Sequence, residues 1–363
     1  MPEHKIKLLV VTPSLGCGGS EKYVSLFCNY IDTQKFKVTL CIINNDTSFY
    51  SITNTAIEII DLQKKHVRTS LFALLKVIRL KQPDIIYTTA NHLNVFIAMF
   101  SSLLRKNIIT IARESSVVSS NTKRAKFPFL YNRLIKKYYK NFDCIICQSK
   151  YMQQDLIDNY FIAENKTVVI NNPVEASQTS VKMPAINKLL TVARLSPEKG
   201  IDRLIYAVAK LTIPFTYYII GDGCQQKNLQ QLINKLHLQN KVFLLGPKQM
   251  PYVGVEDAAL FLMASYYEGF PNTLLEAGML GIPVVAFNAP GGISEIITNG
   301  KNGLLVNDNE VIAFSHAIEK ALNLNFNRQQ IQQTTQSKYL INNIINNTQN
   351  LLIQIYQQHP YKS

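Results

Sequence analysis

The sequence lacks any apolar run long enough to cross a membrane, which takes about twenty residues as a helix. The longest candidate, residues 93–104, is interrupted by asparagine and serine. The apolar run that follows Lys7 ends at Pro13, which is too early for a secretory signal peptide. We therefore expect a protein that is made and kept in the cytoplasm.

The six cysteines form no disulfide framework, as is usual for a reducing compartment. Cys144 and Cys147 form a CxxC inside FDCIICQS, an apolar segment with the pattern of a strand. Residues three apart in a strand point to opposite faces. Since neither a second CxxC nor a histidine cluster accompanies the pair, we interpret both cysteines as core residues and not as metal or redox groups.

Acidic residues are scarce in the first half of the chain, where residues 1–175 hold 23 Lys and Arg against 13 Asp and Glu. The excess peaks at residues 122–140, TKRAKFPFLYNRLIKKYYK, which contain seven basic and no acidic side chains. If helical after Pro128, this segment predicts an amphipathic surface for anionic membrane lipids. A solvated basic face and nucleic-acid binding are alternatives. The chain has no recognisable nucleic-acid-binding motif, so no nucleic-acid partner is expected.

What the sequence does contain is a regular alternation of short apolar strands and longer amphipathic helices, which is typical of parallel α/β architecture. In residues 1–173, strands are predicted at 7–13, 37–43, 56–62, 84–89, 107–113, 143–149 and 167–171. Helices are predicted between them at 20–31, 70–81, 92–104, 129–139 and 150–158.

The alternation stops in residues 174–187, which we interpret as an interdomain linker, and it restarts in residues 188–328. The strands predicted there are 188–194, 216–223, 242–247, 259–265, 283–287 and 303–306. Residues 329–363 keep apolar side chains at helical spacing and predict a helical segment that packs back on the body. The fold class that follows is α/β, with two tandem Rossmann-like doubly wound domains.

The motif with the strongest chemical signal is SYYEGFPNTLLEAGMLGIPVVAF, residues 265–287. A strand ends at Ser265, a tight turn follows, and a helix begins near Asn272. Glu268 lies in the turn and Glu276 in the helix. This layout brings helix N–H groups, which favour phosphate, beside carboxylates that can bond sugar hydroxyls. Either glutamate alone would more often be a solvated or capping residue.

The segment is similar to the E-x7-E motif of the family 4 retaining glycosyltransferases, whose GT-B fold has two Rossmann-like domains that face each other across a cleft. Further matches extend over nearly the whole chain: TVARLSPEKGIDRLIYAVAKL (191–211), YYIIGDGCQQKNL (217–229), VFLLGPKQMPYV (242–253) and GGISEIITNGKNGLLV (291–306). Each match alone would be weak, whereas together they are specific.

The resemblance implies roles for single residues. Arg194 and Lys199 would contact the donor diphosphate, Glu276 the ribose, and Glu268 the transferred sugar, with surface pairing of Arg194 and Lys199 to Glu198 or Asp202 as the alternative. Further donor-binding positions would be Gly221, Pro247, Gly269, Phe270, Asn272 and Thr273. Cationic side chains and oriented N–H groups at these places would stabilise the charge of the departing nucleoside diphosphate.

In the first domain, VTPSLGCGGSEKYV (11–24) follows a strand and opens a helix. Gly16, Gly18 and Gly19 allow close approach of a ligand, and the resemblance implies that they face the donor phosphate. A plain tight turn is the alternative. Glu21 occupies the last glycine position of a dinucleotide fingerprint, so a dinucleotide site is not predicted.

Two further positions follow predicted strands of the first domain. His92 would contact the donor sugar near its reacting carbon in the family interpretation, although a lone histidine is more often structural. Arg113 and Glu114 are candidates for binding the acceptor, including a phosphate that it carries, or for a simple surface pair. No D-x-D occurs in the chain, and we expect neither a metal nor a cofactor.

The function that follows is retaining transfer of a sugar from a nucleoside diphosphate donor, by family frequency a UDP-hexose or UDP-N-acetylhexosamine. The acceptor would be a glycan or lipid-linked glycan in surface polysaccharide synthesis, at the inner face of the plasma membrane. A non-catalytic glycan-binding protein, and an epimerase or phosphorylase of the same fold, are the alternatives. A dehydrogenase would need an intact dinucleotide fingerprint, which the chain does not supply.

Overall fold

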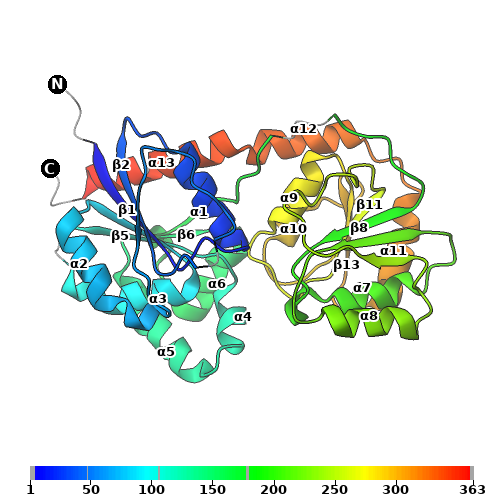
Figure 1. Cartoon of the computed structure of the whole chain (residues 1–363), viewed down its shortest axis with the longest axis horizontal. Helices are drawn as coiled ribbons and strands as arrows, with labels where there is room; N and C mark the ends of the chain where they lie inside the picture. The colour runs from blue at the N-terminus through cyan, green and yellow to red at the C-terminus, as the bar shows by residue number, and fades with distance from the viewer. Residues whose placement is uncertain (1–4, 47, 105–106, 177–179, 360–363) are drawn as a thin grey trace. The chain divides into compact units, whose positions relative to one another are not determined.

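The computed structural model describes residues 5–46, 48–104, 107–176 and 180–359. The chain forms two compact units (Figure 1). Unit 1 comprises Met1–Pro173 together with Ile341–Ser363, and unit 2 comprises Val174–Leu340. The C-terminal segment, expected as a single helical addition to the body, is thus divided between the units at Leu340.

Unit 1 is built on a seven-stranded sheet with the order β3-β2-β1-β4-β5-β6-β7. The strands are β1 (Ile6–Thr12), β2 (Phe36–Ile42), β3 (Glu58–Asp61), β4 (Ile85–Thr89), β5 (Ile109–Arg113), β6 (Cys144–Cys147) and β7 (Thr167–Val169). Neighbouring strands pair in parallel, with Leu8 of β1 opposite Val38 of β2 and Ile85 of β4. The order runs outward in both directions from β1, which is the doubly wound arrangement predicted from the sequence.

The helices of unit 1 are α1 (Gly19–Tyr30), α2 (Leu71–Lys81), α3 (Asn91–Phe100), α4 (Val118–Lys123), α5 (Pro128–Tyr138), α6 (Lys150–Tyr160) and α13 (Ile341–Gln358). Short 3-10 turns are η1 (Val67–Thr69), η2 (Ser101–Leu103), η3 (Tyr139–Asn141) and η4 (Glu164–Lys166). Helix α5 begins with Pro128, at a position where the missing N–H would have no helical partner. Helix α4 was not predicted, because VSSNTK has no apolar periodicity.

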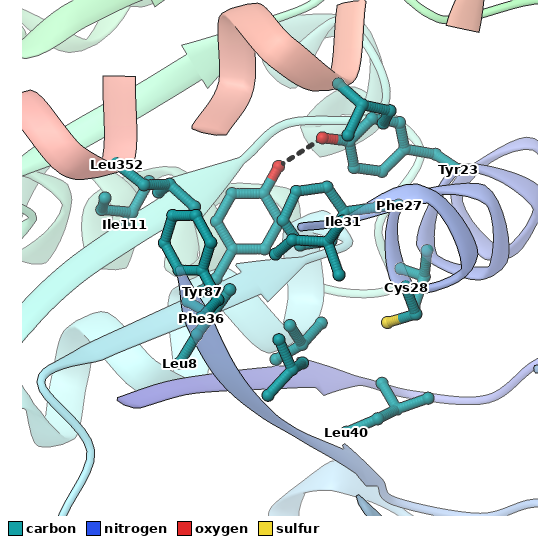
Figure 2. Packing of buried hydrophobic residues seen from close by; sticks show 14 of the residues in the cluster. Leu8, Tyr23, Phe27, Cys28, Ile31, Phe36, Leu40, Tyr87, Ile111 and Leu352 are labelled. Atoms are coloured by element: carbon teal, nitrogen blue, oxygen red, sulfur yellow. Dashed lines mark hydrogen bonds between the residues drawn. The ribbon is translucent and has the colours of Figure 1, made fainter. Parts of the chain in front are cut away.

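Each face of the unit 1 sheet carries a hydrophobic core, and the core under α1 also includes α13. Figure 2 shows Phe27 of α1, Tyr87 of β4 and Leu352 of α13 in this cluster. The rings of Phe27 and Tyr87 stack at 5.3 Å, and the hydroxyls of Tyr23 and Tyr87 lie 2.9 Å apart in a hydrogen bond. Leu352 is fully buried, so the C-terminal helix forms part of the unit 1 core.

The CxxC cysteines lie in different cores, as their spacing in β6 predicts. Cys144 packs in the core under α1 and α13, whereas Cys147 packs in the opposite core with residues of α2, α3, α5 and α6. Both are free, and burial raises the pKa of the Cys144 thiol to about 12 and that of Cys147 still further above its usual value. Their interpretation as core residues is confirmed.

Unit 2 is built on a six-stranded parallel sheet with the order β10-β9-β8-β11-β12-β13. Its strands are β8 (Lys188–Val192), β9 (Thr216–Ile220), β10 (Val242–Leu244), β11 (Leu260–Met263), β12 (Val284–Phe287) and β13 (Gly303–Val306). Its helices are η5 (Pro197–Lys199), α7 (Ile201–Val208), α8 (Gln226–Lys235), α9 (Asn272–Met279), α10 (Ile293–Ile296), α11 (Val311–Leu322) and α12 (Arg328–Tyr339). The apolar side chains of the sheet and helices again form a core on each face.

The two sheets share one topological feature that bears on function. Each sheet has one pair of neighbouring strands at which the strand order reverses direction. This pair is β1 and β4 in unit 1, and β8 and β11 in unit 2. In open α/β sheets, the crevice beyond the carboxyl ends of such a strand pair is where ligands bind. Each unit therefore has one place at which site residues are expected to meet.

Candidate functional site

In unit 2, the loops after β8 and β11 bring together a lysine, a serine and a glutamate. Lys199 Nζ lies 2.6 Å from Glu268 Oε1, and the hydroxyl of Ser265 donates to the same oxygen at 2.6 Å. The Lys199 and Glu268 side chains are only 23% and 12% exposed. Partial removal from water strengthens such a charge-assisted contact. The structure thus joins two predicted site residues directly and adds Ser265, which the sequence interpretation had treated only as a strand end.

The backbone of the Glu268 turn is fixed by the loop that follows β12. The Glu268 N–H donates to the carbonyl of Pro290 at 3.0 Å, and the Gly292 N–H donates to the carbonyl of Gly269 at 3.0 Å. Gly291 has φ of +123°, and a Cβ at this position would overlap the carbonyl oxygen of Glu268. Only glycine combines this backbone conformation with so close an approach. The segment GGISE thereby sets the position of the Glu268 carboxylate.

Arg194 lies in the loop after β8 with its side chain 64% exposed. It forms an ion pair with Glu198 at 2.7 Å, as the alternative interpretation proposed, and not with Asp202. Burial alone would raise the pKa of Glu198, but hydrogen bonds from Ser196 and Arg194 outweigh it and hold that pKa below its usual value. An exposed arginine with one neighbouring carboxylate keeps several N–H groups directed to solvent, where they can bind an anion.

Glu276 lies on α9, behind the turn, beside the loop that follows β10. The hydroxyl of Tyr252 donates to the carbonyl of Thr273 at 3.2 Å. Burial, together with the charge of Glu276 and its hydrogen bond, raises the pKa of Tyr252 well above its usual value. Tyr252, which the sequence interpretation did not single out, therefore fixes the first turn of α9 and the carboxylate of Glu276 relative to one another.

The remaining positions predicted in unit 2 differ in burial. Phe270 is 3% exposed and packs edge-on against Tyr339 with ring centroids 5.5 Å apart, so its side chain belongs to the core. Asn272 begins α9, and its buried Oδ1 has no hydrogen-bond partner. Gly221 has φ of +146° and lies against the carbonyl of Ala193, which packs the turn after β9 onto the loop that carries Arg194. Pro247 is exposed in the loop after β10.

In unit 1, the glycine-rich turn after β1 is covered by a carboxylate of its own helix. A Cβ on Gly18 would overlap Glu21 Oε2, and Ser14 Oγ lies 3.5 Å from Glu21 Oε1. Gly18 is the N-cap of α1, and Gly19 its first residue. A carboxylate near a helix N-terminus is favourable, and the Glu21 carboxylate lies against the N-cap Gly18.

His92 lies in the first turn of α3, just after β4, and its side chain is exposed on the wall of a pocket. The surrounding protein nevertheless desolvates the ring and lowers the pKa of His92 below its usual value. The imidazole is therefore neutral at pH 7 and can accept or donate a hydrogen bond.

Arg113 and Glu114, predicted to read the acceptor or to form a surface pair, are 1% and 0% exposed. The guanidinium of Arg113 stacks 3.6 Å from the ring centroid of Tyr23 and donates to Asn172 Oδ1 at 2.6 Å. Both side chains thus lie in the interior and do not form a surface pair, and their role toward the acceptor stays a prediction. The sequence pattern does not show this burial, because Arg113 ends β5 and Glu114 follows it, and only packing decides whether that edge of the sheet is open.

Glu114 accepts hydrogen bonds from three neutral side chains: Asn94 at 2.7 Å, Tyr139 at 2.7 Å and Asn91 at 3.3 Å. Burial raises the pKa of Glu114, and these hydrogen bonds oppose the rise. Asn91 and Asn94 flank His92 on α3. The buried carboxylate therefore orients the helix turn that carries the histidine.

The basic segment folds as expected and leaves apolar side chains at the surface. Phe127, Phe129 and Leu130, at the start of α5, are 64%, 81% and 55% exposed. Four exposed cations lie in the same stretch of the chain: Lys123, Arg124, Lys126 and Arg133. We call these seven residues the basic helix surface. Exposed aromatic residues amid basic ones are typical of surfaces that bind anionic lipid head groups.

Within residues 5–46, 48–104, 107–176 and 180–359, no three His, Cys, Asp or Glu side chains group closely enough to hold a metal ion. Among the helices of the same ranges, none combines the length and apolar character that a membrane crossing requires.

Comparison with known proteins gives two family matches. Residues 17–178 match the family model "Glycosyltransferase Family 4", and residues 175–338 match the family model "Glycosyl transferases group 1". The junction of the two matches lies close to the boundary between the units at Pro173.

Individual relatives agree with these matches. The chain is 29% identical, over 84% of its length and 87% of the relative, to the N-acetylgalactosamine-N,N'-diacetylbacillosaminyl-diphospho-undecaprenol 4-alpha-N-acetylgalactosaminyltransferase of Campylobacter jejuni. It is 30% identical to the lipopolysaccharide core biosynthesis glycosyltransferase LpsE of Rhizobium meliloti, over 50% of this chain and 55% of that protein.

Solved structures with the same fold include the lipopolysaccharide outer core galactosyltransferase WaaB, with a TM-score of 0.77, 18% identity and coverage of 96% and 99% of the two chains. The HepE protein of Anabaena, solved with UDP-glucose, has a TM-score of 0.76 at 20% identity and coverage of 96% and 100%. At these identities the likeness establishes the GT-B fold.

Proposed function

This chain belongs to the glycosyltransferases that the two family models describe, and we propose that it is a retaining enzyme that uses a UDP-hexose or UDP-N-acetylhexosamine. The observation that carries the proposal is the contact of Lys199 with Glu268 at the switch point of unit 2, directly before the N-terminus of α9. A cation, a carboxylate and free helix N–H groups are the chemistry that a sugar diphosphate requires.

In this proposal unit 2 binds the donor. Arg194, Lys199 and the first N–H groups of α9 bind the diphosphate, and Glu276 binds the ribose hydroxyls. Glu268, held by Lys199 and Ser265, accepts hydrogen bonds from hydroxyls of the transferred sugar. The choice of UDP is supported by the solved HepE complex with UDP-glucose. In unit 1, Gly16, Gly18, Gly19 and His92 stay predicted donor-binding positions.

The proposed reaction proceeds on one face of the sugar. The bond between the anomeric carbon and the diphosphate oxygen breaks, and its electron pair leaves with the diphosphate. The acceptor hydroxyl oxygen forms the new bond from the same side, and its proton passes to the departing phosphate oxygen. Arg194, Lys199 and the α9 N–H groups stabilise the charge that develops on the leaving group. No protein nucleophile takes part, so a stable glycosyl adduct on Glu268 would contradict this mechanism.

We propose a glycan or lipid-linked glycan at an anionic membrane as the acceptor. The Campylobacter relative is named for an acceptor on diphospho-undecaprenol, and the basic helix surface has the composition of a lipid-binding face. Phe127→Ser with Phe129→Ser should weaken co-sedimentation with phosphatidylglycerol vesicles severalfold. The matched control is Phe161→Ser with Tyr151→Ser, which removes exposed aromatic residues of α6 and its C-cap. Equal binding by both variants would exclude this surface.

The transferase proposal is tested by release of UDP from a panel of UDP-sugars, with and without membrane lipid extract. We expect lipid-stimulated release from one donor, which Glu276→Ala abolishes and Glu319→Gln leaves unchanged, since Glu319 lies on α11, outside the predicted donor site, and accepts a hydrogen bond from the hydroxyl of Thr212. Turnover without acceptor would indicate an epimerase. Binding of UDP-sugar without turnover, for every donor and acceptor fraction, would indicate a non-catalytic glycan- or nucleotide-sugar-binding protein.

A further inference from the structure

A pocket of about 470 Å³ opens at the carboxyl edge of the unit 1 sheet. Its lining comes from the loops after β1, β2 and β3 and from one side of α3. The volume is in the range of pockets that bind small ligands. The sequence contained a signal for this pocket in the run KKHVR, which follows a predicted strand, but nothing in the run shows that it faces α3.

One wall of the pocket is apolar. Val95, Phe96 and Met99 line it together with His92, and their spacing places all four on one face of α3. Phe96 also lines a crevice between α2 and α3, whose volume of about 10 Å³ is too small for a lipid chain. The crevice therefore does not extend the pocket far enough for a hydrocarbon tail, and the apolar wall suits a compact group with an apolar face, such as a sugar ring.

The opposite wall is positively charged. Lys64, Lys65 and Arg68 line the pocket with exposed side chains, and the lining includes no Asp or Glu. Among the described residues, no carboxylate forms an ion pair with any of the three. Such uncompensated charge in a concave site attracts anions.

The cationic wall belongs to an ordered loop. The Lys64 N–H donates to the carbonyl of Ile43 at 2.8 Å, which ties the loop to the end of β2. At its other end, Ser70 is fully buried, and its hydroxyl donates to the carbonyl of Val67 at 2.6 Å. The positions of Lys65 and Arg68 relative to α3 are therefore set by backbone contacts on both sides.

We propose that this pocket is the acceptor subsite and that it binds a sugar phosphate. The phosphoryl group binds Lys64, Lys65 and Arg68, and the sugar ring packs against Phe96 and Met99. Arginine and lysine at adjacent positions bind phosphate oxygens as a planar fork and as a point charge. This inference rests on the proposed transferase function, since it names the acceptor class as glycans that carry a phosphate or diphosphate at the reducing end.

The direct test is calorimetric titration with N-acetylglucosamine 1-phosphate in saturating UDP, which blocks the diphosphate-binding groups of unit 2. We expect Lys65→Gln with Arg68→Gln to weaken binding at least tenfold. The matched control, Lys76→Gln with Arg79→Gln, also removes one lysine and one arginine, both exposed on α2 and outside the pocket, and should bind normally. Equal affinity of the two variants would overturn the proposal, as would equally tight binding of methyl N-acetylglucosaminide.

A second arm separates the two sources of the phosphate. N-acetylglucosamine joined through a diphosphate to a short prenyl chain is titrated in the same way. Tighter binding than the soluble sugar phosphate supports a lipid-borne acceptor, and equal binding supports recognition of the phosphosugar alone. Loss of this binding in Lys76→Gln with Arg79→Gln and not in the pocket variant would overturn the proposal. Because the readout is binding, it is independent of UDP release, so failure of the transferase proposal would be seen separately.

Discussion

The two units handle charge in opposite ways at their sheet edges. In unit 2 the cations near the switch point are compensated, with Lys199 paired to Glu268 and Arg194 to Glu198. In unit 1 the pocket cations Lys65 and Arg68 have no paired carboxylate among the described residues, whereas the carboxylate of Glu114 is buried among neutral donors.

This difference bears on what each unit can bind. A compensated site is nearly neutral before its ligand arrives, and its carboxylates remain available for sugar hydroxyls once phosphate takes over the cations. An uncompensated cationic pocket favours any anion of suitable size and loses selectivity as salt screens it. Unit 2 thus has both carboxylates for sugar hydroxyls and cations for a diphosphate, whereas the unit 1 pocket has cations that suit an anionic group.

The largest effect should follow from breaking the compensation in unit 2. Glu268→Gln keeps the shape of the side chain but removes the partner of Lys199 and the charge near the transferred sugar. We expect kcat for transfer to fall by about 100- to 1,000-fold, the usual effect of losing one preorganised electrostatic contact. Steady-state kinetics with the active donor measures this, and a change below threefold would remove Glu268 from the site.

The next largest effect concerns stability, and it tests how much the buried Glu114 carboxylate contributes to the folding of unit 1. Glu114→Ala removes one acceptor from each of Asn91, Asn94 and Tyr139 and leaves a cavity among them, and should lower the free energy of unfolding by roughly 3 kcal/mol. Glu164→Ala, on the surface of the same unit, should change it little. Urea denaturation followed by circular dichroism compares the two variants.

The same carboxylate should make stability depend on pH. Because burial raises its pKa in the folded state, the folded protein binds the Glu114 proton more tightly than the unfolded chain does. The resulting contribution to the free energy of unfolding is fully present below the pKa of Glu114 in the unfolded chain. It is lost as pH rises through the raised pKa of the folded protein. Glu114→Gln should flatten that slope, and an unchanged slope above pH 4.5 would assign it to other groups.

A substitution that moves the Glu268 turn without altering its charges tests whether the position of this turn matters for activity. Gly291→Ala forces the loop after β12 away from the Glu268 carbonyl, and we expect kcat to fall about tenfold because small displacements of site residues are costly. Gly246→Ala is the control, since Gly246 also has positive φ but no neighbour where a Cβ would lie. Equal activity of both variants would show that the turn tolerates the shift.

The smallest effect is expected at His92, where unit 1 contributes a neutral ring. His92→Gln should lower kcat/KM about fivefold, the loss of one hydrogen bond of roughly 1 kcal/mol. Because its folded pKa lies below the usual value, the native enzyme should lose activity on acidification only below pH 6.5. The pH profile of the variant should lack that acid limb, and a retained limb would assign it to another group.

The sequence by itself determined the elements and the motif around Glu268. Short continuous apolar runs predict β1 and β11, because a strand that is buried on both faces needs apolar side chains at successive positions. The spacing of Glu268 and Glu276 predicts their places because a turn and a helix are local structures, fixed by residues within a few positions.

Tertiary structure alone decided which groups meet and which are buried. The pairing of Lys199 with Glu268, the burial of Arg113 and Glu114 and the attachment of α13 to unit 1 each join residues far apart in the chain. The local pattern at such positions is the same whether the sheet edge is open or covered. The cost of burying a charge depends on partners that only the folded chain supplies.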